Sequence, residues 1–229
     1  PVESDMPADT KLEYLKRIIP SAIRSGELDA EKTREILALC AGLGNTDILA
    51  YLEETLLLYL PNENPVIRVT VLNNLALLRS ELTRTVLLDS LRDPHPLVRE
   101  YAAQHLFALL QEPGMPAKLA PLADRMAVAL DDESDSVRIY AYKAFARLPE
   151  DAFDAMAVFL KANADACERV RLVGLEKLAA MEGLHAPLIR GAFQDACAER
   201  SPELRRQACL GLRHYPDDTS IELLLHLLK

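Results

Sequence analysis

The sequence predicts an all-α fold, a right-handed α-solenoid of stacked antiparallel helix pairs. Apolar residues recur at helical spacing along the chain, and no stretch alternates polar and apolar residues as a half-buried β-strand would. Five pairs of an aliphatic residue and an arginine share one surrounding residue pattern, and they recur at intervals of 31 to 39 residues. Self-similarity at roughly 20 to 50 residues is typical of arrays whose units pack on their neighbours. We therefore expect about five repeats, a divergent N-terminal helix pair and a C-terminal half repeat.

Each repeat carries the same residue types at fixed distances from its arginine. The arginines are Arg68, Arg99, Arg138, Arg171 and Arg205. Six residues earlier the side chain is polar, and in four repeats acidic: Asn62, Asp93, Asp132, Asp165 and Glu199. Three residues later it is small or β-branched: Val71, Ala102, Ala141, Gly174 and Ala208. Seven residues later it is large and apolar: Leu75, Leu106, Phe145, Leu178 and Leu212.

The predicted elements follow from this register. Two N-terminal helices, Lys11–Arg24 and residues 29 to about 41, lack the arginine signature and form a divergent first pair over residues 1–45. Within residues 46–218, each repeat has a helix A, a tight turn and a helix B that opens with the aliphatic-Arg pair. The expected A helices are Asp47–Leu60, Thr83–Leu91, Ala117–Leu130, Asp151–Ala162 and Leu184–Cys197. The expected B helices are Pro65–Leu78, Pro96–Leu110, Ser136–Leu148, Glu168–Ala180 and Pro202–His214.

The last element, Ser220–Leu228 within residues 219–229, is expected to be the A helix of a further repeat. A solenoid needs its last apolar face covered, so we expect the array to continue past Lys229 or to form a larger assembly there. No linker-like segment divides the chain, which predicts a single domain over 1–229.

Composition limits the partners. Half of the residues are apolar, and the net charge is −9, with 12 acidic and 6 basic residues in the first 64. This balance argues against nucleic acid as the main partner, because gripping phosphates needs clustered positive charge. It favours a protein or peptide with a basic segment instead. The four cysteines lack metal-ligand or disulfide spacing, which favours a reducing intracellular compartment, the cytoplasm, and no apolar run is long enough to span a membrane.

The pattern resembles the HEAT-repeat family, close to the armadillo type of α-solenoid. The resemblance rests on the acidic residue, the aliphatic-Arg pair and the small-then-large apolar positions, and is clearest in residues 93–102 and 132–138. It covers about residues 46 to 229. It implies that the repeated Asp and Arg form ladders across neighbouring units, that helix B lines the concave surface, and that the superhelix serves as a scaffold for other macromolecules.

The arginine column has two interpretations. It could be a basic strip that binds an acidic partner, or an internal ladder in which each arginine binds turn carbonyls and the acidic residue six positions earlier, in its own or the adjacent unit. We favour the ladder, because an acidic residue accompanies nearly every arginine. The predicted ladder residues are Arg68, Arg99, Arg138, Arg171, Arg205, Asp93, Asp132 and Asp165.

The outward positions of helix B are the better candidates for binding. With the apolar positions buried, the second and fifth residues after each arginine share the opposite edge of the helix. The predicted partner-binding residues are Thr70, Asn73, Tyr101, Gln104, Tyr140, Lys143, Glu176 and Gln207. Tyr101 and Tyr140 are expected to be neighbours at the centre of this patch, since tyrosine is frequent at binding centres. The alternative is that both rings pack on helix-B neighbours.

We find no catalytic, metal-binding or cofactor motif, and predict no enzyme activity and no cofactor. The deoxyhypusine hydroxylases of this fold need His-Glu pairs, and none of the five histidines precedes a glutamate. The alkylpurine DNA glycosylases use tryptophan and a basic groove, whereas this chain has no Trp. The predicted function is a non-catalytic scaffold or adaptor that binds a protein or peptide along helix B. Two alternatives stay open, a nucleic-acid or chromatin scaffold and an enzyme subunit such as a bilin lyase.

Overall fold

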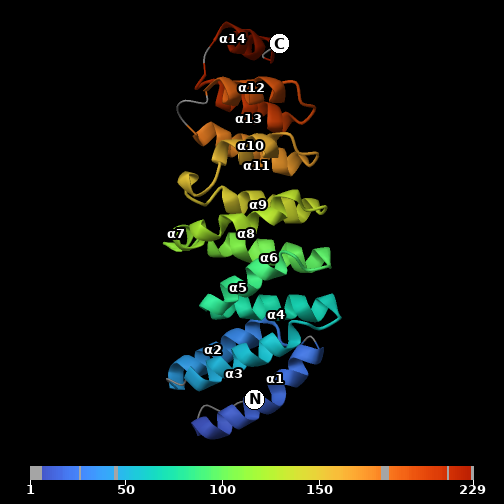
Figure 1. The fold of residues 1–229 in the computed structure, drawn as a ribbon, viewed down its shortest axis with the longest axis vertical. Helices are drawn as coiled ribbons and strands as arrows, with labels where there is room; N and C mark the ends of the chain where they lie inside the picture. The colour runs from blue at the N-terminus through green and yellow to red at the C-terminus, as the bar shows by residue number, and fades with distance from the viewer. Residues whose placement is uncertain (1–6, 26, 44–45, 182–185, 216, 228–229) are drawn as a thin grey trace. The chain divides into compact units, whose positions relative to one another are not determined.

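The structure, a computed structural model, describes residues 7–25, 27–43, 46–181, 186–215 and 217–227. These residues form helices joined by short turns, and no β-strand occurs among them (Figure 1). The all-α class predicted from the sequence is therefore confirmed. The chain forms two compact units, Pro1–Leu106 and Phe107–Lys229. That the two form one continuous domain over 1–229 stays a prediction.

The first unit consists of successive helix pairs. Its helices are α1 (Ala8–Ser25), α2 (Ala30–Leu43), α3 (Thr46–Tyr59), α4 (Pro65–Leu78), α5 (Glu81–Ser90) and α6 (Pro96–Leu109), the last of which ends in the next unit. Helix α1 packs against α3, and α2 packs against α4. Helices at equivalent places in successive pairs thus lie side by side, which is the packing of an α-solenoid.

The second unit continues the same order. Its elements are α7 (Met115–Leu119), the 3₁₀ turn η1 (Ala120–Leu122), α8 (Ala123–Met126), η2 (Ala127–Asp131), α9 (Asp135–Phe145), η3 (Glu150–Ala152), α10 (Ala155–Asn163), α11 (Glu168–Ala180), α12 (Ala186–Ala196), α13 (Pro202–Leu212) and α14 (Asp218–Leu227). Helix α11 packs against α9, α10 and α13, and α10 also contacts α12. The B helices α9, α11 and α13 therefore form one row.

Local chemistry sets where the B helices begin. The side chain of Asn64 accepts a hydrogen bond from the backbone N–H of Val66 at 3.0 Å, and Pro65 occupies the first turn, where its missing N–H costs nothing. Ser201 caps α13 in the same way before Pro202. The predicted bounds of α4, which carries these local signals, agree with the structure at both ends, and so do those of α11.

The repeated apolar positions form the core. All ten residues that lie three or seven positions after a ladder arginine are buried. At Gly174, three residues after Arg171, the neighbouring backbone leaves no room for a side chain. A Cβ atom there would lie 2.9 Å from the backbone nitrogen of Asn163 and 3.1 Å from the carbonyl oxygen of Phe159. The backbone of α10 therefore approaches α11 closely at this point.

The single A helix predicted over Ala117–Leu130 is wrong. The structure divides this segment into α7, η1, α8 and η2. Pro121 explains the break, because it has no N–H to donate and its ring excludes the regular helix at the preceding turn. Leucines and alanines still face the core from these short pieces, and Leu119, Ala123, Met126 and Leu130 are all buried.

The A helix predicted over Asp151–Ala162 begins later than expected. Residues Glu150–Ala152 form a 3₁₀ turn, Phe153 is extended, and α10 starts at Ala155. The break places the Phe153 ring 4.9 Å from that of Phe145, edge to face. Asp154 then caps α10 by accepting a hydrogen bond from the Ala157 N–H at 3.0 Å.

The remaining predicted ends differ by a few residues. Helix α9 ends at Phe145 rather than at Leu148, and α13 ends at Leu212 rather than at His214. The predicted helix Ser220–Leu228 is α14. Leu184, Leu228 and Lys229 lie outside the described residues, and the continuation of the array stays a prediction.

Candidate functional site

Every ladder arginine binds the turn that precedes its own helix. In each case Nη1 donates to the carbonyl oxygen six residues earlier, at 2.7 to 2.9 Å, and to the next carbonyl, at 2.8 to 3.3 Å. The first of these carbonyls belong to Asn62, Asp93, Asp132, Asp165 and Glu199. The arginine thus satisfies carbonyls that the tight turn leaves without a helical partner.

The other edge of the guanidinium reaches the acidic residue of the following repeat. Arg68 donates to both carboxylate oxygens of Asp93, at 2.6 and 2.8 Å. Arg138 forms the same fork with Asp165, at 2.8 and 2.9 Å. The side chains of both pairs are only 10 to 13% exposed. In the last such pair, Arg171 Nε lies 2.9 Å from Glu199 Oε1, and this pair is more exposed.

Each ladder aspartate also shapes its own turn. The carboxylates of Asp93, Asp132 and Asp165 accept hydrogen bonds from the backbone N–H two residues later, at 2.7 to 2.9 Å. The ladder aspartate of each turn therefore stabilises the A-to-B turn. Asp93 and Asp165 also bind the ladder arginine of the preceding repeat. This double role is a physical reason for the acidic residue at that position.

Electrostatics supports an ion pair between Arg138 and Asp165. Partial burial alone would raise the pKa of the Asp165 carboxyl, but hydrogen bonds from Arg138 and from the Cys167 N–H hold that pKa below its ordinary value. The hydrogen bond to Asp165 likewise raises the pKa of Arg138 above its ordinary value. Both groups therefore stay charged at neutral pH, and the Arg138 donors are committed to contacts within the protein.

We call the positions two and five residues after each ladder arginine the helix-B surface. In the first unit these are Thr70 and Asn73 on α4, and Tyr101 and Gln104 on α6. Gln104 is exposed and the other three are half-buried. The Thr70 hydroxyl donates to the Val66 carbonyl of its own helix at 3.0 Å. This part of the surface is polar and uncharged.

His105, which the sequence analysis did not select, joins two of these side chains. Its Nε2 lies 2.7 Å from Asn73 Oδ1, and its ring centroid lies 6.3 Å from that of Tyr101. Burial lowers the pKa of His105 below its ordinary value, so the ring is neutral at pH 7. The His105 ring thus contacts both the Asn73 amide and the Tyr101 ring.

A buried polar contact behind this surface joins α2 to α4. Asn74 Nδ2 donates to the carbonyl oxygens of Leu28, at 2.9 Å, and Thr70, at 2.7 Å, while the Thr33 hydroxyl donates to Asn74 Oδ1. Thr33 and Asn74 are both almost fully buried. This contact holds the divergent first pair against the first regular repeat.

In the second unit the helix-B surface carries two charged side chains, Lys143 and Glu176, together with the exposed Leu210 and the buried Val173. Tyr140 and Lys143 lie on α9, Glu176 lies on α11 and Gln207 on α13. Lys143 Nζ lies 5.8 Å from the Tyr140 ring centroid and 6.0 Å from that of Phe107. Glu176 is exposed, and Gln207 is half-buried. The predicted neighbour relation of Tyr101 and Tyr140 spans the two units and stays a prediction.

A groove opens in this part of the helix-B surface. It encloses about 290 Å³ and is lined by Phe107, Lys143, Arg147, Val173, Glu176 and Lys177, together with two alanines. Lys143 and Glu176 were selected from the sequence, whereas Phe107, Arg147 and Lys177 were missed. Arg147 lies nine residues after Arg138, one helical turn beyond Lys143, so the periodicity contained a signal for it.

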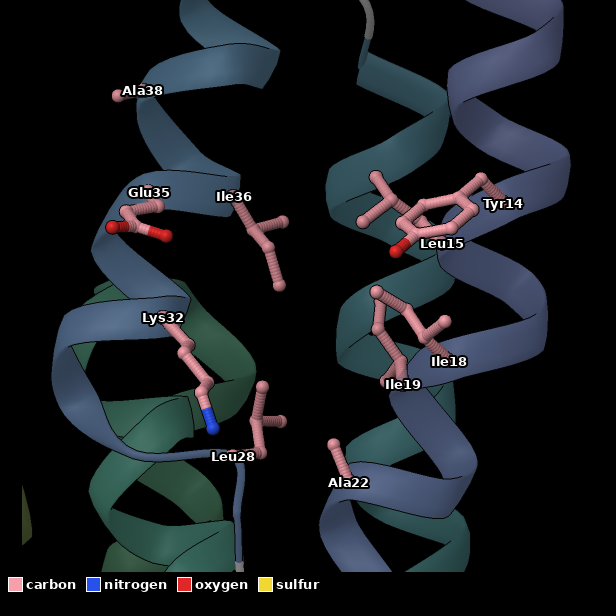
Figure 2. A pocket seen from close by; sticks show the side chains of 10 residues that line it. All are labelled: Tyr14, Leu15, Ile18, Ile19, Ala22, Leu28, Lys32, Glu35, Ile36 and Ala38. Carbon is pink, nitrogen blue, oxygen red and sulfur yellow. The ribbon is translucent and has the colours of Figure 1, made fainter. Parts of the chain in front are cut away.

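A second groove lies between α1 and α2 and encloses about 740 Å³. Figure 2 shows Tyr14 and Ile18 of α1 facing Leu28 and Ile36 across it. Lys32 and Glu35 add charged groups on the α2 side. The groove is mainly apolar, and it belongs to the acidic N-terminal third of the chain.

Within the described residues, no group of three or more His, Cys, Asp or Glu side chains is placed to hold a metal ion. Nor does any helix in the described part of the chain have the length and apolar character needed to cross a membrane.

Solved structures share this fold. YibA of Escherichia coli matches with a TM-score of 0.65 and 14% identity, over 100% of this chain and 83% of that chain. A designed armadillo repeat protein in complex with the peptide (KR)4 matches with a TM-score of 0.61 and 16% identity, over 93% and 96% of the two chains. A second designed armadillo repeat protein gives 0.59 and 15%, with the same coverage.

The fold is a HEAT- and armadillo-like helical repeat. The solenoid class predicted from the arginine register is thus confirmed. At 14 to 16% identity the likeness shows the fold alone. No protein-family model matches the sequence, and no curated protein matches it either.

Proposed function

We propose that this helical repeat is a non-catalytic scaffold that binds a protein or peptide segment along its helix-B surface. The proposal rests on the difference between the arginines, which are bound within the protein, and the outward side chains of helix B, which are available to a partner. All five ladder arginines bind their own turns, and Arg68 and Arg138 also bind largely buried carboxylates, whereas most second and fifth positions after the arginines present tyrosine, amide or charged groups. Tyrosine is frequent at the centres of protein interfaces, where polar and charged side chains commonly form the rim.

A neighbour of the same fold supports a peptide as the partner. The designed armadillo repeat protein in that comparison was solved with the basic peptide (KR)4. In the present chain the first 64 residues carry 12 acidic and 6 basic residues, which favours a basic segment there. Attraction between opposite charges would speed the encounter and would weaken as salt is added.

The proposal is tested by affinity purification of the full chain, identification of what co-purifies, and titration of the identified segment. Tyr101→Ala and Tyr140→Ala are expected to weaken binding about tenfold or more, because each removes a large half-buried ring from the surface. Tyr215→Ala is the matched control, since Tyr215 is a half-buried tyrosine that follows α13, outside this surface and outside the first 64 residues.

Binding that is unchanged in both helix-B variants would move the site elsewhere. A steep salt dependence of binding to DNA would favour the nucleic-acid scaffold, and a visible absorption band in the purified protein would favour the bilin-lyase alternative. Either result would contradict the proposal.

A further inference from the structure

The groove between α9 and α11 carries more positive charge than its surroundings neutralise. Lys143, Arg147 and Lys177 line it, and Glu176 is the acidic side chain among its lining residues. Lys177 Nζ donates to Glu150 Oε1 at 2.7 Å, so its charge is matched. Glu176 is exposed, and Arg206 of the next B helix is paired with Glu203 rather than with Glu176.

The other two cationic side chains, Lys143 and Arg147, form no ion pair with a carboxylate among the described residues. Among the described residues, Lys143 contacts the Tyr140 and Phe107 rings and no acidic group. Arg147 is exposed, and its side chain has neither a hydrogen bond nor an ion pair in the described part of the chain. This is the reverse of the ladder arginines, whose donors are bound by carbonyls and carboxylates. Arg147 thus presents its planar fork of donors to a partner.

The rest of the groove is apolar and small. Phe107 supplies an aromatic wall, Val173 is buried with 7% exposure, and Ala146 and Ala180 leave open space between the helices. A volume of about 290 Å³ is at the lower limit of the roughly 300 to 1,000 Å³ that holds drug-sized ligands. It is suited to one apolar side chain with its immediate neighbour.

We propose that this groove binds a partner peptide segment at an acidic residue adjacent to a large apolar residue. The carboxylate receives the two donors of the Arg147 fork with Lys143 beside it, and the apolar side chain packs against Phe107 and Val173. This inference rests on the proposed function and names the partner chemistry for the second unit. The segment proposed here is acidic, whereas the segment expected for the N-terminal third is basic. Lys143 and Arg147 would repel that basic segment.

The test is an NMR titration of the ¹⁵N-labelled full chain with capped hexapeptides that carry a central Glu-Leu pair among glycines and serines. We expect chemical-shift changes at Phe107, Lys143, Arg147 and Val173 at millimolar peptide. Replacing Glu by Gln in the peptide is expected to weaken binding about tenfold, the size of a lost charge-assisted hydrogen bond. Replacing Leu by Ser is expected to weaken it as well.

Variants of the protein locate the contact. Arg147→Gln is expected to weaken binding of the Glu-Leu peptide about tenfold and to leave binding of the Gln-Leu peptide unchanged, so that the two changes are not additive. Its melting temperature is expected to stay that of the wild type, because Arg147 has no ladder contact. Arg169→Gln is the matched control, since Arg169 is an exposed arginine on α11 that does not line the groove.

Three results would overturn the inference. The first is the absence of shifts in the groove, and the second is equal affinity for the Glu-Leu, Gln-Leu and Lys-Leu peptides. The third is that free glutamate at the same concentration produces the same shifts, which would assign the groove to carboxylates of any source. If Arg147→Gln binds the Glu-Leu peptide normally but Tyr101→Ala and Tyr140→Ala lose a captured partner, the inference fails and the proposed function stands.

Discussion

The two units share an internal ladder and differ in what helix B presents outside it. In the first unit Arg68 and Asp93 form a forked pair, and the surface beside them carries Thr70, Asn73 and Gln104, which are uncharged. In the second unit Arg138 and Asp165 form the same fork. The repeat therefore constrains the residues that hold neighbouring units together and leaves the second and fifth positions after the arginine free to diverge.

The second unit contrasts with the first on its helix-B surface and in its packing. Lys143 and Glu176 stand there in place of neutral side chains, and Arg147 lies one helical turn beyond Lys143. Behind the surface, the first unit uses the buried Asn74 amide to join α2 and α4, whereas the second brings α10 and α11 together at Gly174. The same architecture thus tolerates either a buried polar contact or close backbone packing between helices.

The largest expected effect comes from breaking the shared ladder. Arg138→Gln and Arg68→Gln are each expected to lower the free energy of unfolding by about 3 kcal/mol, because each leaves a largely buried carboxylate without its ion-pair partner. Arg171→Gln is expected to cost less, since Glu199 is 32% exposed. Chemical denaturation followed by circular dichroism measures all three.

Arg147→Gln is the control for the ladder variants, and its stability is expected to match that of the wild type. If Arg138→Gln abolished partner binding with an unchanged melting temperature, the arginines would belong to the binding surface. The ladder interpretation would then be wrong.

The second effect concerns the difference in packing. Gly174→Ala is expected to lower the free energy of unfolding by about 1 to 3 kcal/mol, because the added methyl group meets backbone atoms of α10. Gly191→Ala on α12 is the matched control. Nothing lies within 4 Å of a Cβ atom there, so the better helix propensity of alanine is expected to stabilise by about 0.5 to 1 kcal/mol. Equal effects at both glycines would show that α10 and α11 are not closely packed.

The smallest effect is the pH dependence of the second unit. The pKa of Asp165 is lower in the folded protein than its ordinary value near 3.9, so its ion pair adds stability above that value and loses it as the pH falls through the folded pKa. Asp165→Asn is therefore expected to be less stable than the wild type at pH 7, with a difference that narrows below about pH 4. Denaturation between pH 3 and 7 measures this difference.

Asp131→Asn provides the comparison for that experiment. Asp131 pairs with Lys161 at the surface, where its side chain is 70% exposed. An exposed pair contributes little, so this variant is expected to follow the wild type at each pH. A difference between Asp165→Asn and the wild type that does not change with pH would contradict the ion-pair explanation.

Much of the fold could be predicted because its signals are local and repeated. Pro65 and Asn64 define the start of α4 within two residues, and five copies of the arginine pattern set the register. The failures occurred where one repeat departs from the others. Pro121 divides the A helix predicted over Ala117–Leu130. The extended residue Phe153 packs its ring against Phe145, and α10 begins only after it.

The candidate site was less predictable because it depends on contacts between repeats. Lys143 and Glu176 could be selected by helical position alone. Nothing in the sequence shows that Phe107 on α6 lies within reach of Lys143 on α9, or that Lys177 is matched by Glu150 while Arg147 is not. These are distances between different helices, and spacing along one helix does not contain them.

The sequence by itself determined the helical repeat, its register and which face of each helix is buried, because period, caps and apolar positions are properties of short segments. Only the tertiary structure decided which acidic residue each arginine binds. Arg68 and Arg138 reach the aspartate of the following repeat, while their own turns supply carbonyls. It also decided which cations remain available to a partner, since that depends on the groups that neighbouring helices bring alongside them.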